Sequence, residues 1–325
     1  MSYNNRPEIA KLGAAHLFTP DLEKSLWFFH DVIGLEITAR TENKVYLRAA
    51  MEREHHSLVL EQGDRARLDH VSWRVRRPED LEKFHTLLTE NGNEVAVQPA
   101  DGEDGYGESL RLQMPSGHKL RLYWDVEKPA VAEADRSVLL NQQYKSWHRG
   151  AGVRRIDHVN LWSTHEPEPV HQWLTDNLGF KLREYIQTPH GRVGGWMSVT
   201  PLVHDIAVMK AGPHEMTPTR MHHLAFWLDN AADVLRAADM LVEAGIKIDQ
   251  GPGKHGVSQA FFLYVRDPGS GHRVELFSNG YLIFDPDWEP VEWGVDNIAM
   301  ALAMWGPTDY MPHTDDNIMN TTTEA

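Results

Sequence analysis

RLDHVSWRV (67–75) and RMHHLAFWL (220–228) decide the fold, because they are two versions of one strand. Each is read as the first strand of a unit and carries a histidine at its fourth position, His70 or His223. A second matching pair follows them, MPSGHKLRLYWD (114–125) and DPGSGHRVELFSN (267–279). The chain therefore contains an internal repeat, and a repeat of this kind sets the whole architecture.

Another unit precedes each of these two repeats. Residues 11–63 predict a strand, an amphipathic helix capped by Asp21 and further strands, and residues 153–211 repeat that order. The two helices end at matching glycines, Gly34 and Gly179, and glycine suits the left-handed residue that closes a helix. The chain thus reads as four units of the type βαβββ.

A single βαβββ unit cannot bury both faces of its small sheet, so two units are expected to join their sheets into an open cup. We therefore predict an α+β protein of four βαβββ modules paired into two open barrel-like domains. The expected limits are an N-terminal domain over 1–140, a C-terminal domain over 141–285 and a tail over 286–325. The tail is expected to cover the site in part, with a flexible end.

The composition is that of a soluble globular protein, with 41% hydrophobic and 24% charged residues. No apolar run reaches the roughly 18 residues of a membrane span, and no export signal is evident, so we expect a cytoplasmic protein without a membrane partner. The net charge of -15 argues against nucleic acid as a partner. Because the chain has no cysteine and 19 histidines, any metal is held by nitrogen and oxygen ligands.

One set of residues has the makeup of a metal site. His158 (in IDHVNL) and His223 (in MHHLAF) lie on the first strands of the two C-terminal units, and Glu275 (in HRVELF) lies on a last strand. Two histidines and one carboxylate form the facial triad of non-haem Fe(II) oxygenases. Adjacent residues of a strand face opposite ways, and alignment with Asp157-His158 selects His223 over His222.

The N-terminal pair of units lacks this set. Aligning the repeats places Gly13, His70 and Arg121 at the positions of the three ligands, in chain order. Only one ligand is retained, and a cation replaces the carboxylate. We therefore predict a metal in the C-terminal half and none in the N-terminal half.

These residues lie within segments that resemble the type I extradiol dioxygenases of the vicinal oxygen chelate superfamily. The resemblance is densest in WMSVTPLVHD (196–205), RMHHLAFWLD (220–229) and residues 251–290, and it runs through all four modules and the tail. It is closest to the group of catechol 2,3-dioxygenase, homoprotocatechuate 2,3-dioxygenase and 2,3-dihydroxybiphenyl dioxygenases. DPGSGHRVE (267–275) is one residue longer than in some members, which predicts a longer turn.

The resemblance implies the vicinal oxygen chelate fold, Fe(II) as cofactor, with Mn(II) accepting the same ligands, and a catechol and O2 as substrates. It implies that the ring opens beside the two hydroxyl carbons to give a 2-hydroxymuconic semialdehyde type of product, and that the protein is a homo-oligomer, a tetramer. His204 is expected to titrate near pH 7 as the acid/base. The implied roles are metal ligands His158, His223 and Glu275, catalytic residues His204, Tyr264 and His255, and substrate contacts Asn160, Trp196, His255 and Tyr264.

The substrate is expected to carry an uncharged alkyl or aryl substituent. Members that take an acidic side chain use arginines near the GPG loop and in the tail, whereas this chain has Gln250 before GPG and no cation in NIAMALAMWG (297–306). The alternatives are an acidic catechol of the homoprotocatechuate type, a glyoxalase-like enzyme and a binding protein. His204 and Tyr264 speak against a glyoxalase, and a binding protein does not need a metal triad in one half.

Overall fold

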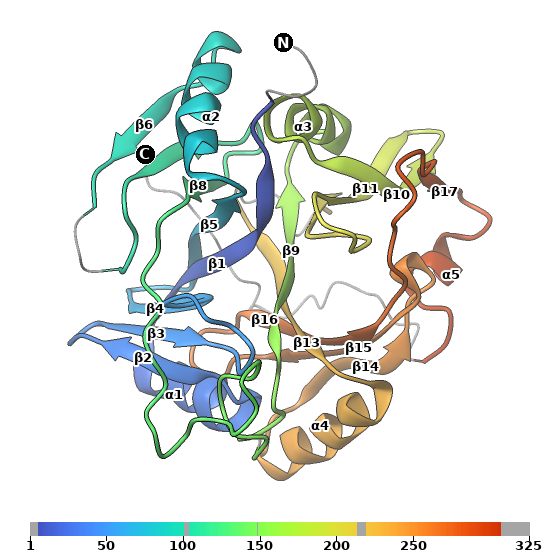
Figure 1. Ribbon diagram of the computed structural model, residues 1–325. Coiled ribbons are helices and arrows are strands. Elements are labelled where there is room, and N and C mark those ends of the chain that lie inside the picture. The colour runs from blue at the N-terminus through green and yellow to red at the C-terminus, as the bar shows by residue number, and fades with distance from the viewer. Residues whose placement is uncertain (1–5, 101–103, 148, 213–218, 307–325) are drawn as a thin grey trace.

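The computed structural model describes residues 6–100, 104–147, 149–212 and 219–306, and two mixed β-sheets form its frame (Figure 1). The first sheet consists of β1 (Ile9–Thr19), β2 (Glu36–Arg40), β3 (Lys44–Arg48), β4 (Leu58–Gln62), β5 (Arg67–Val75), β6 (Val95–Gln98), β7 (Ser109–Gln113) and β8 (Lys119–Tyr123). The second consists of β9 (Arg155–Ser163), β10 (Lys181–Thr188), β11 (Gly191–Ser198), β12 (Ile206–Lys210), β13 (Met221–Leu228), β14 (Ile248–Lys254), β15 (Ala260–Arg266), β16 (Arg273–Asn279) and β17 (Val291–Trp293).

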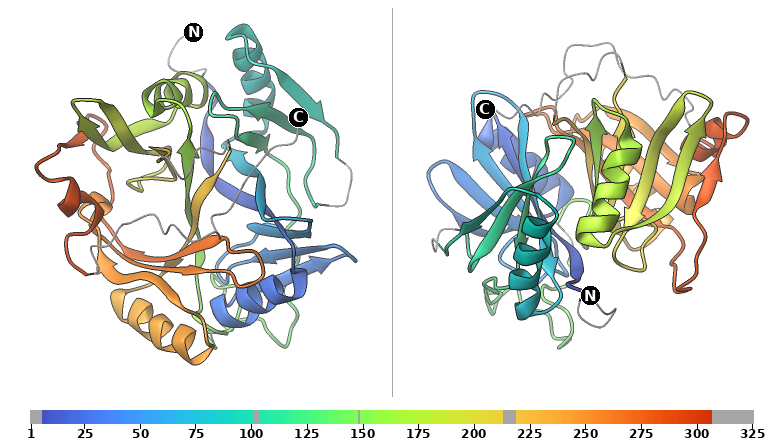
Figure 2. Two further views of the ribbon diagram at one scale, coloured as in Figure 1. Left: turned by 180° about the vertical axis from the view of Figure 1, so that it is seen from behind. Right: turned by 90° about the horizontal axis from the view of Figure 1, so that it is seen from above.

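Both sheets are built on one plan, which confirms the predicted pairing of modules. The strand order is β2-β3-β4-β1-β5-β8-β7-β6 in the first sheet and β14-β15-β16-β13-β9-β12-β11-β10-β17 in the second. The first strands of the two modules pair antiparallel at the centre, β1 with β5 and β9 with β13. The outer strands curve away from this pair, so that each sheet forms a cup, as Figure 2 shows from behind and from above.

Each module contributes one helix to the outside of its sheet (Figure 1). The helices are α1 (Leu22–Trp27), α2 (Pro78–Glu90), α3 (Pro167–Trp173) and α4 (Ala231–Glu243), and a short α5 (Ile298–Leu302) follows in the tail. Asp21 caps α1 as expected, because its side chain accepts a hydrogen bond from the Lys24 backbone at 3.0 Å. No helix in these described ranges is long and apolar enough to cross a membrane.

The helices α1 and α3 both widen into a π-helical last turn, η2 (Phe28–Ile33) and η3 (Leu174–Leu178). Each turn ends at the glycine that the repeat predicted. Gly34 has φ +96° and Gly179 has φ +78°, both left-handed.

One hydrophobic core runs through both halves, and polar contacts join them. Trp73 of β5 meets Phe180 at a ring-centroid distance of 4.9 Å. The turn in DPGSGHRVE docks on α1, since Ser25 Oγ donates to Asp267 Oδ2 at 2.5 Å. Residues 126–152 contain no named strand or helix in their described part, and β17 of the tail joins the second sheet beside β10. The domain limits at 140 and 285 stay predictions.

The two matched glycines give a test of the fold. A Cβ on Gly34 would lie 2.1 Å from the Arg149 carbonyl oxygen, whereas a Cβ on Gly179 would have no heavy atom within 4 Å beyond its chain neighbours. We expect Gly179→Ala to lower the free energy of unfolding by about 1 kcal/mol through the left-handed backbone alone, and Gly34→Ala to lower it by about 3 kcal/mol. Urea unfolding of both variants measures this, and equal losses would contradict the packing around Gly34.

Candidate metal centre

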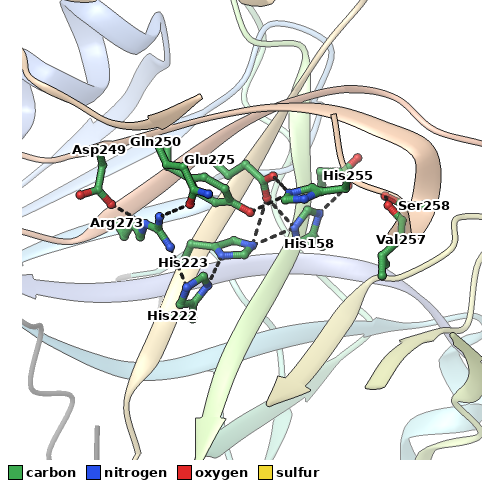
Figure 3. Close-up of polar contacts among 12 residues, drawn as sticks. His158, His222, His223, Asp249, Gln250, His255, Val257, Ser258, Arg273 and Glu275 are labelled. Carbon is green, nitrogen blue, oxygen red and sulfur yellow. Dashed lines mark hydrogen bonds and ion pairs between the residues drawn. The ribbon is translucent and has the colours of Figure 1, made fainter. Parts of the chain in front are cut away.

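Three strands that lie side by side bring His158, His223 and Glu275 together in the second sheet (Figure 3). They come from β9, β13 and β16, which are neighbours in the sheet. Nε2 of His158, Nε2 of His223 and Oε2 of Glu275 are each 3.0 Å from the other two. All three side chains are at most 3% exposed. The residues predicted as ligands therefore form one compact triangle.

The triangle fits a divalent metal ion in both geometry and charge. Ligands at right angles around an octahedral ion, with bonds of about 2.1 Å, lie about 3 Å apart, as these atoms do. Burial disfavours the charged form of His158, yet Asp157 and Glu275 raise its pKa to about 9. The two carboxylates thus favour positive charge on His158, whereas burial lowers the pKa of His223 to about 4, and two imidazoles with one carboxylate suit Fe(II) or Mn(II).

A carboxylate behind His158 fixes the orientation of its ring. Nδ1–H of His158 donates to Asp157 Oδ1 at 2.8 Å, and Arg155 forms an ion pair with Asp157 Oδ2 at 2.6 Å. This leaves Nε2 of His158 free to hold a metal. The supporting role of Asp157 was missed in the sequence, although an acidic residue next to a candidate ligand is a usable signal.

A second chain of contacts stands behind His223. Nδ1 of His222 lies 2.5 Å from Nδ1 of His223, and Arg273 donates from Nη1 to His222 Nε2 at 2.6 Å. Arg273 in turn pairs with Asp249 at 2.6 Å. His222 therefore does not join the triangle, as strand alternation predicted, but it does contact one of its members, which alternation did not predict.

Tyr264 and His255 stand on the open side of the triangle. The Tyr264 hydroxyl lies 3.1 Å from Nε2 of His255, which is 3.5 Å from Oε1 of Glu275. The ring of His255 stacks on Phe262 at 4.0 Å, and its Nδ1 contacts the Leu302 carbonyl of the tail. A phenol and an imidazole are thus held beside the position of a metal.

His204 reaches the same cavity from the segment before β12, with its ring centroid 4.0 Å from that of His158. Burial and then the neighbouring His158 hold the pKa of His204 well below its usual range. Burial therefore favours the neutral ring over the charged one, and the expected titration of His204 near pH 7 stays a prediction. The neutral ring is the form that accepts a proton.

Asn160 and Trp196 line the cavity as expected. Asn160 Oδ1 is buried and has no hydrogen-bond partner within the described ranges, so it is an acceptor available to a bound molecule. Trp196 lines the same cavity and belongs to an apolar cluster. The remaining lining residues are Leu302, in the tail segment that the sequence considered for the substituent, and Met209, Val257, Ser258, Phe277 and Ala301, which it did not single out.

Strand pairing corrects one part of the comparison between the two halves. Ala14, and not Gly13, occupies the position of His158. The alignment was one residue off because it followed the spacing of the helix ends, and the segment between the end of the strand and the closing glycine is one residue shorter in the first half. Arg121 does occupy the position of Glu275, as predicted.

Known proteins match the chain along most of its length. Residues 155–276 match the Glyoxalase/Bleomycin resistance protein/Dioxygenase superfamily, and residues 68–127 match the Catechol 2,3-dioxygenase-like N-terminal domain. The manganese-dependent 2,3-dihydroxybiphenyl 1,2-dioxygenase of Geobacillus genomosp. 3 is 54% identical over 92% of this chain and 95% of that protein. The metapyrocatechase of Geobacillus stearothermophilus is 38% identical over 90% and 88%.

More distant matches agree with these. An iron-dependent extradiol dioxygenase of Rhodococcus jostii is 25% identical over 84% of this chain and 90% of that protein. The substrate complex of homoprotocatechuate 2,3-dioxygenase from Brevibacterium fuscum superposes with a TM-score of 0.80 at 31% identity, covering 93% of this chain and 90% of that one. With its paired cups and its triangle of two imidazoles and a carboxylate, the chain belongs to the type I extradiol ring-cleaving dioxygenases of the vicinal oxygen chelate superfamily.

Proposed function

We propose that this protein uses O2 to open an uncharged, alkyl- or aryl-substituted catechol beside its two hydroxyl carbons. The observation that carries the proposal is the 3.0 Å triangle of His158, His223 and Glu275 beneath a cavity lined by imidazole, phenol and apolar side chains. The glyoxalase-like and binding-protein alternatives lose their support, because the relatives matched over most of the chain are named as catechol dioxygenases.

The proposed metal ligands are His158, His223 and Glu275, and the proposed ion is Fe(II) or Mn(II). Relatives of both kinds are named, one manganese-dependent and one iron-dependent. When bound, such an ion supplies a path for electrons from the catechol ring to O2, which reacts slowly with a ring on its own. The protein then has to orient the catechol, exclude water and handle its protons.

Three side chains beside the triangle handle the protons of the substrate. The Tyr264 hydroxyl donates to a catechol oxygen and stabilises its anionic form, and His255, 3.1 Å away, holds that hydroxyl in place. The neutral imidazole of His204 accepts the proton of the other hydroxyl and returns it to oxygen as the ring opens. The unpaired Oδ1 of Asn160 orients the substrate from β9.

The choice of an uncharged substituent rests on the lining of the cavity. Within the described ranges no Lys or Arg lines it, and a buried substrate carboxylate needs a paired cation. Trp196, Met209 and Leu302 present apolar surface, which suits an alkyl or aryl group. The most similar of the named relatives acts, by its name, on 2,3-dihydroxybiphenyl.

Three further expectations accompany the proposal and rest on the sequence. They are a homotetramer, a cytoplasmic location and the domain limits at 140 and 285. Size-exclusion chromatography with light scattering tests the first of them.

The first test is reconstitution. The protein is purified, stripped of metal and loaded with Fe(II) or Mn(II) without air, and then given catechol, 3-methylcatechol, 2,3-dihydroxybiphenyl or homoprotocatechuate with O2. We expect a yellow ring-opened product from the three uncharged catechols, with kcat/KM at least about tenfold lower for homoprotocatechuate because its carboxylate finds no cation. A preference for homoprotocatechuate would contradict the assignment of an uncharged substrate. The absence of product with either metal would contradict the proposed function.

The second test determines which of the two cups holds the metal ion. Glu275→Ala removes one of three ligands and is expected to abolish metal retention after dialysis, whereas Arg121→Ala, at the equivalent position of the first cup, leaves it at one ion per chain. Elemental analysis of both variants measures the outcome. Equal loss in the two variants would contradict the assignment of the metal to one half.

The third test concerns proton transfer. His204→Asn removes the proton acceptor without touching the triangle, so kcat is expected to fall by about 10²-fold or more while the metal content stays at one ion per chain. Steady-state kinetics on 3-methylcatechol, with metal analysis of the same sample, checks this. An unchanged kcat would show that His204 does not act as a proton acceptor in the reaction.

A further inference from the structure

The first cup contains a cavity of about 240 Å³ at the place equivalent to the metal centre. Strand pairing puts Arg121 at the position of Glu275 and Arg111 at the position of Tyr264. Both arginines line the cavity, and Arg121 is 3% exposed. Two guanidinium groups thus occupy the positions that the second cup gives to a carboxylate and a phenol.

The two arginines face each other across the ladder. Arg111 of β7 and Arg121 of β8 are directly opposite in an antiparallel pair, where like charges destabilise a sheet. Burial and then the charge of Arg121 lower the pKa of Arg111 to about 10. The fold therefore holds two guanidinium groups side by side at a cost in stability.

The protein neutralises one of the two charges. Arg121 forms an ion pair with Asp104 and lies 4.6 Å over the ring of Tyr106, although its buried Nε has no hydrogen-bond partner within the described ranges. Arg111 forms no ion pair within these ranges, and its one hydrogen bond runs from Nε to Gln98 Oε1 at 2.7 Å. The terminal amino groups of Arg111 are therefore available to an acceptor.

The other acidic groups of the cavity are already engaged. Asp69 accepts from Nδ1 of His70 at 2.6 Å. Glu61 contacts His16 at 2.9 Å and Lys44 at 3.6 Å. Neither carboxylate pairs with Arg111, so the cavity presents a guanidinium fork that lacks its anion.

We propose that this cavity binds a small organic carboxylate, which lies between Arg111 and Arg121. A guanidinium fork matches a carboxylate with two parallel hydrogen bonds, and a second guanidinium beside it adds to the attraction. The volume lies below the usual range of about 300–1,000 Å³ for ligand pockets, which favours an acid with a single ring or a short chain. The second cup then binds a metal cation, and the first cup binds an organic anion on the same scaffold.

A metal ion is the rival occupant. His16, Asp69 and His70 offer ligand atoms within 4.8 Å of one another. However, the same cavity is lined by Lys44 and by the two arginines, which repel a dication. The carboxylates are also taken up by hydrogen bonds to the histidines. The two guanidinium groups thus favour an anion between them, and the metal becomes an outcome of the test.

The experiment measures binding of radiolabelled benzoate to the metal-loaded full-length protein by equilibrium dialysis. We expect one saturable site per chain. Arg111→Gln is expected to weaken it by at least about tenfold, because a charge-assisted pair is lost. Lys119→Gln removes an equal charge from the neighbouring strand β8 outside the cavity, and it is expected to leave the affinity within about twofold.

Three results would overturn the proposal. The first is that the unsubstituted protein shows no saturable benzoate binding. The second is that Arg111→Gln binds benzoate with equal affinity, which would place benzoate at the metal centre or elsewhere, and the third is a second Mn(II) per chain that disappears in His16→Ala. If thermal unfolding shows that Arg111→Gln does not fold, Arg111→Lys takes its place. Lysine keeps the charge but not the planar fork, so the same loss of about tenfold is expected.

Discussion

The antiparallel pairing of β9 with β13 is the constraint on which the site depends. This ladder fixes which face of β9 and which face of β13 point into the cup. The pairing of β16 with β13 does the same for a third strand beside them. A shift of one residue in either pairing would turn His223 or Glu275 to the other face, because side chains alternate along a strand. The 3.0 Å triangle is therefore a property of sheet register, held by backbone hydrogen bonds that are buried on both sides.

The same register, applied to a different sequence, produces the first cup. There Ala14 and Arg121 stand at two of the three ligand positions, and Arg121 brings its charge with it. A guanidinium at this place supplies permanently the positive charge that the second cup has to acquire from an ion. One register thus presents a carboxylate in the second cup and a guanidinium at the equivalent position of the first.

The sequence alone predicted the modules, their pairing and the metal triangle, because each has a strong local signal. Strand alternation, helix-closing glycines and the types of three residues are all readable along the chain. The features that were missed depend on spatial contacts. Arg273 reaches His222 from 51 residues away, and no periodicity reports such a contact. The lowered pKa of His204 depends on burial, and the place of Ala14 depends on pairing that helix spacing does not report.

The tail illustrates how a segment with little pattern of its own acquires a definite place. Buried Glu184 accepts hydrogen bonds from the Ser258 backbone at 2.7 Å, from the Tyr281 hydroxyl at 2.8 Å and from Trp293 Nε1 at 2.7 Å. Burial raises the pKa of this carboxyl, and the three donors oppose the shift. One acidic side chain of β10 thereby ties the turn at Ser258, the segment at Tyr281 just before the tail, and β17 to the second sheet. Because α5 follows β17, this anchor also helps to set where Ala301 and Leu302 meet the cavity, which Ser258 lines as well.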